Sequence, residues 1–483
     1  MRRTKSFSAG AACLIGACLS TATLLAKPQQ PAPAAATGPN LEHQTPNTAT
    51  MAAPSPEPRV PNPESRTQSP DLTLADLERM ALAHNPTLPE AQADVRASEG
   101  RKLQSGLYPN PTIGYEGREI NTGPVYRGGE HGLFVEQPIV TGGKLGLSRR
   151  VFATEAEQAQ SEAVAQRQRV LNSVRIAYYR ALGAQERVQI MSDLADLARR
   201  AAATSAELAN VGQADQPDVL EARVEAGRAR LDLLAAQSAQ ESIWQELAAT
   251  VGDPALPMTT LAGKLDDPLP AIDPKQALAT ILSQSPEVQT AAEGVTRAEE
   301  ALKRARAEKL PDVELRGGVD YNRELLGLMN APVGWEGEAE VGVQIPLFNR
   351  NQGNVRTAEA ELTHAREELE RVQLALRSNF AAAFHDYAES AEVVGTYRDQ
   401  ILPDAGKAYQ LYLGKYREMA AAYPQVLIAQ RTWFQLREEY TAALVTEWES
   451  AVAIQGFLLT DGLAAPLAPG EPATLWPGVE VKP

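Results

Sequence analysis

A segment that occurs twice constrains this chain more than any other feature of its sequence. Gln137–Gly143 ends a strand-like stretch and opens a long helical one, and Gln344–Arg350 does the same with an offset of 208 (346 − 138). About 65 residues of Ala-, Glu-, Gln- and Arg-rich sequence follow each segment, then a Pro-x-Val-Leu-x-Ala step. These steps begin at Pro217 and Pro424, an offset of 207 (424 − 217). Two landmarks with nearly one offset indicate an internal duplication.

The composition excludes several classes of protein. Of the 483 residues 43% are hydrophobic and only 5% aromatic, which favours thin helix–helix seams over one large globular core. The net charge of −15 (46 − 61) comes without a basic patch, so we expect no nucleic-acid partner. The only cysteines are Cys13 and Cys18. The body of the protein therefore has neither a disulfide network nor a cysteine-based metal site.

The N-terminus is typical of an exported protein. A basic start and an apolar stretch of about ten residues form a signal peptide, too short to span a bilayer. The stretch ends in Leu14-Ile15-Gly16-Ala17-Cys18, which resembles a bacterial lipobox. We therefore expect a signal peptide over 1–17 and lipid on Cys18, followed by a flexible Pro/Ala-rich linker over 18–70. The alternative is an ordinary signal peptide cut after Ala26.

The rest of the chain divides into two matched halves. We place the first repeat at 71–262, an inter-repeat linker at 263–273, the second repeat at 274–462 and a C-terminal tail at 463–483. Each repeat begins with a short helix, stopped at Asn85-Pro86 or at Ser285-Pro286, and a second helix. These steps, 200 residues apart (286 − 86), break helices because the residue before proline avoids helical angles.

Four stretches alternate between apolar and polar residues, two in each half. They are Thr112–Glu119, Gly132–Gln137, Asp312–Tyr321 and Glu338–Ile345. Alternation with period two marks strands with one apolar and one wet face, as in a transmembrane barrel. Four strands cannot close a barrel, and an open edge is not tolerated in lipid, so we expect a trimer with twelve strands. The alternative is a small soluble sheet.

Two long helical hairpins fill the remainder. No proline occurs from 143 to 210, which allows a helix of about 100 Å. A similar stretch runs from 352 to 416, with an interruption expected near Leu402-Pro403. Shorter helices return over 217–251 and 424–460, with tips at 211–216 and 417–423 between them. Apolar spacings of three and four residues favour coiled-coil packing.

This arrangement resembles the TolC-like outer-membrane efflux proteins. The resemblance covers residues 71–462 and is carried by Tyr108-Pro109-Asn110-Pro111, by Glu136–Lys144 and by the Val-Leu steps after the tips. In sequence, these segments are most similar to the cobalt–zinc–cadmium cation efflux branch of the family. The resemblance implies a mainly α fold with a small β part: a helical α-barrel and a 12-stranded transmembrane β-barrel, formed by a homotrimer in the outer membrane. It also implies a periplasmic adaptor and an inner-membrane RND pump as partners.

The resemblance further implies roles for individual residues. Adaptor contacts map to the two tips, at Gly212, Gln213, Ala214, Asp215, Met419, Ala420, Ala421 and Ala422. Met419 replaces the glycine usual at the second tip. Candidates for the pore entrance are Asp218, Glu221, Tyr416 and Gln425. Gln425 and Ile428 stand where many relatives carry acids, whereas the first half keeps its acids.

The chain carries no recognisable catalytic chemistry. Its five histidines are scattered, and no nucleophile stands beside a base. We therefore predict no enzyme activity, no cofactor and no metal site, so that energy comes from a partner. Three functions stay open: a passive duct for heavy-metal cations, a duct for drug efflux or type I secretion, and a periplasmic coiled-coil scaffold lipoprotein that spans no membrane.

Overall fold

The computed structural model describes residues 71–120, 129–212, 215–269, 271–326, 331–418, 420 and 423–466. All of them belong to one unit, Thr67–Pro483. The predicted signal peptide, Cys18 and the predicted linker lie outside the described residues, as does most of the predicted tail. None of the described helices has an apolar stretch long enough to cross a bilayer.

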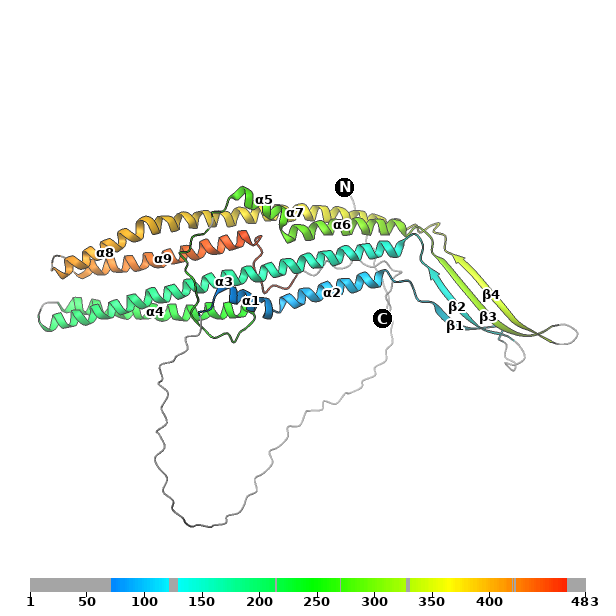
Figure 1. The fold of residues 1–483 in the computed structure, drawn as a ribbon, viewed down its shortest axis with the longest axis horizontal. Helices are drawn as coiled ribbons and strands as arrows, with labels where there is room; N and C mark the ends of the chain where they lie inside the picture. Colours follow the sequence, from blue (N-terminus) through cyan, green and yellow to red (C-terminus); the bar gives the residue numbers. More distant parts are fainter. Residues whose placement is uncertain are drawn as a thin grey trace, which may run out of the picture. The chain divides into compact units, whose positions relative to one another are not determined.

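The described elements repeat in the same order in both halves, which confirms the duplication (Figure 1). The first half contains α1 (Leu74–His84), α2 (Thr87–Ser105), β1 (Thr112–Arg118), β2 (Glu130–Ile139), α3 (Lys144–Asn210) and α4 (Gln216–Val251). The second contains α5 (Pro274–Gln284), α6 (Pro286–Ala307), β3 (Val313–Leu326), β4 (Ala331–Val343), α7 (Gln352–Thr396), the π-helical turn η2 (Tyr397–Ile401), α8 (Leu402–Arg417) and α9 (Tyr423–Gln455).

The short helices begin at side-chain caps. Thr73 and Asp76 form a reciprocal capping box at the start of α1, and Asp273 accepts a hydrogen bond from the Gln276 amide at 2.8 Å. Such caps satisfy amides that have no partner within the helix. Asn85 and Ser285 end α1 and α5 in extended conformation, as the following prolines require.

The two long hairpins differ in continuity. Helix α3 runs unbroken for 67 residues, whereas its counterpart is divided into α7, η2 and α8. The interruption predicted near Pro403 is confirmed. Proline has no amide to donate to the preceding turn, and the wider turn Tyr397–Ile401 accommodates that loss.

Helix α9 ends five residues earlier than the sequence suggested, at Gln455 rather than 460. Phe457 and Leu458 have φ of 61° and 62°, outside the helical region. The fully buried Asn172 of α3 donates to the carbonyl oxygens of Gly456 and Leu459 at 2.9 and 2.7 Å. A polar side chain of another helix thus binds the end of α9, which sequence periodicity cannot reveal.

The four strands form one antiparallel sheet in the order β1-β2-β3-β4. The predicted start of the last strand at Glu338 was wrong, because β4 begins at Ala331. Its first half contains Pro332, Gly334 and Gly337, residue types that are uncommon inside strands. Pro138 lies within β2, but pairing with β1 ends at Glu136, so its missing amide costs no hydrogen bond on that side.

The largest apolar core lies around the middle of α3. Val174, Tyr178 and Leu182 of α3 pack there with Leu247 of α4 and Leu444 of α9. Helix α3 also contacts α2 and α6. The first and second repeats therefore share this core, which is centred on α3.

Candidate functional site

The sheet has two unlike faces. Cross-strand register places Ile113 opposite Val135 and Leu315 opposite Val341 on one face. Large apolar side chains on this face are solvent-exposed, between 42% and 77% of each: Ile113, Tyr115, Leu133, Val135, Leu315, Val319, Trp335, Val341 and Val343. An exposed apolar surface of this size marks an interaction with lipid or with another protein.

The opposite face is acidic. In the paired rows it carries eight carboxylates against two guanidinium groups. The acids are Glu116, Glu130, Glu136, Glu314, Asp320, Glu336, Glu338 and Glu340, and the bases are Arg118 and Arg316. The formal charge of this face is therefore −6 in one chain (2 − 8).

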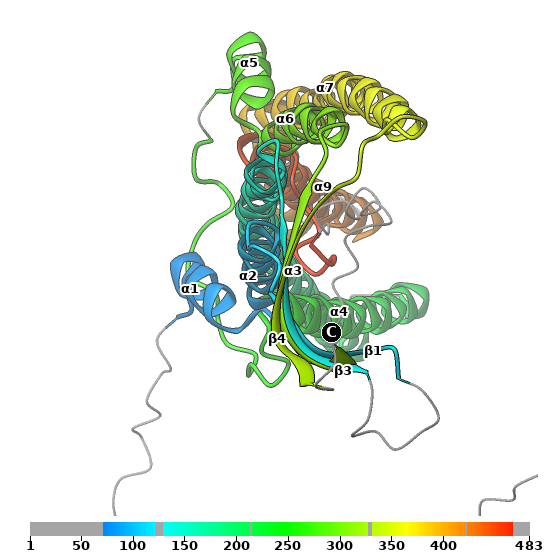
Figure 2. The same cartoon turned by 90° about the vertical axis from the view of Figure 1, so that its right-hand side faces the viewer.

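The acidic face is the concave one. Arg118 of β1 contacts Glu338 of β4 at 2.5 Å, although these strands lie at opposite edges of the sheet. In a flat sheet the two residues would be roughly 14 Å apart across the strands and 13 Å along them. Arg316 of β3 likewise reaches Glu116 of β1. Only a sheet curled around its acidic face allows both pairs, and Figure 2 shows this curvature.

The Thr141–Lys144 segment of the first repeat is a structural junction. Lys144 is 3% exposed and its Nζ lies 2.9 Å from Asp312, which also accepts the Thr141 amide at 2.8 Å. The pair connects the start of α3 with the start of β3. Its lysine is therefore committed to a carboxylate.

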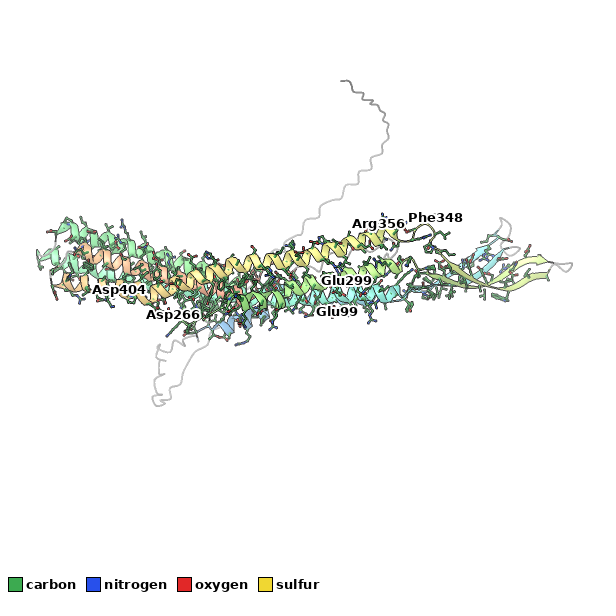
Figure 3. The ribbon with its side chains drawn as sticks, turned by 90° about the horizontal axis from the view of Figure 1, so that it is seen from above. Glu99, Asp266, Glu299, Phe348, Arg356 and Asp404 are labelled. Atoms are coloured by element: carbon green, nitrogen blue, oxygen red, sulfur yellow. The ribbon has the colours of Figure 1, made fainter. Side chains whose placement is uncertain are left out.

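The matching junction in the second half exposes large apolar side chains. Phe348, between β4 and α7, is 92% exposed, and Ile345 and Leu347 are also exposed. Figure 3 shows Phe348 beside Arg356 at this end of α7. Exposed aromatic side chains at the ends of strands are common at membrane interfaces.

The first hairpin tip is a tight turn. Gly212 has φ of 73° and its amide donates to the Ala209 carbonyl at 3.1 Å. Asp215 follows as the exposed N-cap residue of α4, with Pro217 in the first helical turn. A left-handed angle favours glycine here. Gln213 and Ala214 lie outside the described residues.

Less of the second tip is described. Ala420 is exposed and its amide donates to the Lys415 carbonyl at 2.8 Å. Met419, Ala421 and Ala422 lie outside the described residues. Gln425 and Ile428 are exposed on α9.

The structure brings most of the predicted entrance residues together. The Tyr416 and Tyr423 rings lie 5.7 Å apart. Burial raises the pKa of Tyr423 to about 12, with further contributions from Tyr416 and from the negative charges of Glu225, Glu221 and Asp218. The tyrosines of the second tip thus stand beside the acids of the first.

An ion pair that sequence reasoning missed joins the two tips. Glu225 of α4 is 7% exposed and lies 2.6 Å from Arg431 of α9. The two positions are 206 residues apart, close to the repeat offset. That near-equivalence, an acid in one repeat and a base in the other, is the signal that could have revealed it.

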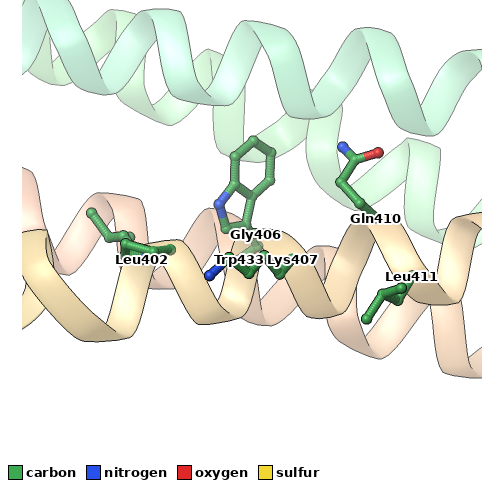
Figure 4. Close-up of a pocket in the computed structure, with 7 residues that line it drawn as sticks. Leu402, Gly406, Lys407, Gln410, Leu411 and Trp433 are labelled. Carbon is green, nitrogen blue, oxygen red and sulfur yellow. The ribbon is translucent and has the colours of Figure 1, made fainter.

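Beside the π-helical turn α8 and α9 form a shallow, mainly apolar groove (Figure 4). Trp433 of α9 stacks on Tyr409 at 5.6 Å and approaches the bare backbone of Gly406. Leu402, Leu411 and Lys407 also line the groove. Across the described part of the chain, no three His, Cys, Asp or Glu side chains gather in a way that could hold a metal ion.

Comparisons with known proteins agree with this architecture. A family model described as outer membrane efflux protein matches residues 77–253 and 277–453, one match in each repeat. The cobalt-zinc-cadmium resistance protein CzcC of Cupriavidus metallidurans is 28% identical over 389 residues, covering 80% of this chain and 90% of the relative. Protein CyaE of Bordetella pertussis is 28% identical over 434 residues, covering 84% and 88%.

A solved structure of CusC, from work on its folding and transmembrane channel formation, superposes with a TM-score of 0.68 at 19% identity. It covers 86% of this chain and 99% of that one. The outer membrane protein VceC of Vibrio cholerae superposes with a TM-score of 0.64 at 19% identity, covering 80% and 95%. Together with the two family matches, the duplicated hairpins and the two-faced sheet identify the chain as a member of the outer membrane efflux protein family.

Proposed function

We propose that this chain is the outer-membrane duct of a tripartite efflux system and conducts heavy-metal cations passively to the exterior. The observation that carries the proposal is the sheet: apolar and exposed outside, curled and acidic inside. An acidic lumen attracts cations and repels anions. The likeness to a cobalt-zinc-cadmium resistance protein supports the same class of substrate.

The duct forms from three copies. Strands β1 and β4 are the free edges of the described sheet, and edges exposed to lipid must be paired. Closure by three chains gives twelve strands. Native mass spectrometry of the detergent-extracted protein tests this, with three copies expected; a monomer would favour the scaffold alternative.

The domain division and the lipid anchor belong to the proposal. The repeats 71–262 and 274–462 form the duct, and lipid on Cys18 with the linker 18–70 attaches each copy to the membrane. The division is supported by the order of helices and strands, which is the same within 71–262 and within 274–462. Mass analysis of the mature N-terminus separates acylated Cys18 from a chain beginning at Lys27.

The tips contact the adaptor, and Asp218, Glu221, Tyr416 and Gln425 surround the entrance. This assignment is supported by the position of Tyr423, which lies beside Tyr416 and close to Asp218 and Glu221 of the first tip. A photo-crosslinking residue in place of Gln213, or of Ala421 at the other tip, tests the contact in living cells.

Each crosslinked product has a distinct meaning. The adaptor of a metal-exporting pump is expected. The adaptor of a drug pump or of a type I secretion system would keep the duct and overturn the substrate. No adaptor from either tip would favour the scaffold. Deletion of the gene should also lower resistance to cobalt, zinc or cadmium, with wild-type complementation as the control.

A further inference from the structure

On the concave face two acids stand directly opposite each other on neighbouring strands. Asp320 of β3 pairs in register with Glu336 of β4. The row continues through Gly132 of β2 to Glu116 of β1 and contains no base. Like charges directly opposite destabilise a sheet, so a cation between them would stabilise this row.

Asp320 is the unusual member of the pair. The residue is 9% exposed, and its Oδ1 stands 1.7 Å from where a β-carbon on residue 132 would be. The carboxylate therefore fills the space above Gly132, inside the concave face. Within the described residues it accepts no hydrogen bond and joins no ion pair. A largely buried carboxylate without hydrogen-bond donors is stabilised by a cation that reaches it.

The two arginines of this face are engaged elsewhere. Arg118 is bonded to Glu116 at 2.8 Å and to Glu338 at 2.5 Å, and attracts Asp320 only through space. Arg316 contacts Glu116 and covers the Phe134 ring at 4.3 Å. The carboxylates left without an arginine in this row are those of Asp320 and Glu336.

The side-chain amide of Asn322 lies next to the Asp320–Glu336 pair and adds no charge to it. Asn322 donates to Glu336 at 3.3 Å and to Glu130 at 3.1 Å, so it orients Glu336 without neutralising it. With two carboxylates rather than three, a bound cation keeps most of its water, as hydrated divalent ions do at such sites. Weak binding of this kind suits a conduit, where an ion must enter and also leave.

We propose that Asp320 and Glu336 form a weak binding point for hydrated divalent cations on the inner wall of the duct. The proposal rests on the proposed function, because the concave face must enclose the lumen. It assigns cation recognition to the sheet, whereas the second hairpin tip carries Gln425 and Ile428 at its entrance.

Strand β4 supplies a matched control. Glu340 lies on the same face and strand as Glu336 and is also exposed, but its partner in register is Arg316. Glu336→Gln and Glu340→Gln remove the same charge from the same wall. Only the first disturbs the acidic pair.

The test uses the full-length protein in planar lipid bilayers, with potassium current recorded while Co²⁺ is added. Glu336→Gln and Asp320→Asn should raise the Co²⁺ concentration for half-block by about tenfold, because each removes one of two charged ligands. Glu340→Gln should shift it by less than about twofold, as expected for a distant charge.

Two results would overturn the binding point: wild-type current insensitive to Co²⁺, or equal shifts in Glu336→Gln and Glu340→Gln, which would indicate diffuse charge. Glu336 is exposed, so its variant tests the proposal even if Asp320→Asn fails to fold. Metal resistance of the deletion strain is a separate readout. Block by Co²⁺ without any change in resistance would refute heavy-metal export as the proposed function and leave the duct and its binding point standing.

Discussion

The two repeats have the same elements but use their long helices differently. In the first half α3 is continuous and buries residues along its length, among them Val170, Val174 and Leu182. In the second half α7 buries few residues, and a π-helical turn separates it from α8. The long helix of the first repeat forms the core of the chain, whereas the long helix of the second repeat has an exposed surface that can contact other chains.

The tips differ in the same sense. The first contains Gly212 in a left-handed conformation and the acids Asp218 and Glu221, and the second contains Tyr416 and Tyr423. Because the acids of one tip lie beside the tyrosines of the other, the two repeats complement each other. Duplication followed by divergence thus produced an asymmetric pair from one supersecondary unit.

The largest difference in stability is expected between substitutions in α3 and substitutions in α7. Leu182→Ala removes a side chain that is 4% exposed and should cost about 2–5 kcal/mol, because it leaves a cavity in the shared core. Leu374→Ala on α7, 58% exposed, should change the unfolding free energy by less than about 0.5 kcal/mol. Thermal unfolding in detergent compares them. Equal losses would mean that another copy covers α7 as fully as the core covers α3.

A smaller difference is expected between the two strand–helix junctions. Asp312→Asn leaves the buried Lys144 charge only the more distant Glu308 carboxylate, at 3.8 Å, and should cost about 2 kcal/mol. At the second junction Asn351 donates to the Ala305 carbonyl at 2.8 Å with φ of 60°. Asn351→Gly keeps that angle available and should cost about 1 kcal/mol. Denaturation curves rank the two variants; the reverse order would show that the ion pair contributes little.

Pro403→Ala should make the second long helix resemble the first. With an amide restored at this position, the wide turn Tyr397–Ile401 can close into regular α-helix. The unfolding free energy should then change by on the order of 1 kcal/mol. Hydrogen exchange should slow for amides around residue 403, while those of α3 serve as the internal reference. Unchanged exchange would mean that packing, rather than proline, holds the π-helical turn.

The smallest effect concerns the pH dependence of the tips. Because the folded pKa of Tyr423 is raised to about 12, its contribution to stability is complete below its ordinary pKa and is lost as the pH rises toward 12. Tyr423→Phe should remove one late-ionising tyrosine from an absorbance titration. Asp218→Asn or Glu221→Gln should lower the pKa of Tyr423. If neither does, the acids are too far away to act on it.

Local patterns predicted most of the fold. Alternating residues such as Val313 and Leu315 identified strands, and the Asn-Pro and Ser-Pro steps identified helix breaks, because these signals depend on neighbours in the chain. The start of β4 was missed where Pro332, Gly334 and Gly337 resemble a loop. There, pairing with β3 outweighs poor intrinsic strand propensity.

The candidate site was predicted only in part. Tyr416, Asp218 and Glu221 were selected from a family resemblance, and the structure places them around Tyr423. Glu225 with Arg431, and Asp320 with Glu336, were not selected. Their significance depends on a partner far away in the sequence, which no local pattern specifies.

The amino-acid sequence by itself determined the duplication, the type of nearly every element and the alternation of the two sheet faces, since each follows from short-range periodicity. Only the tertiary structure decided the curvature that brings Arg118 to Glu338, the end of α9 at the side chain of Asn172, and the meeting of the two tips. These features arise from contacts between residues far apart in the chain, whose geometry depends on how whole helices and strands pack.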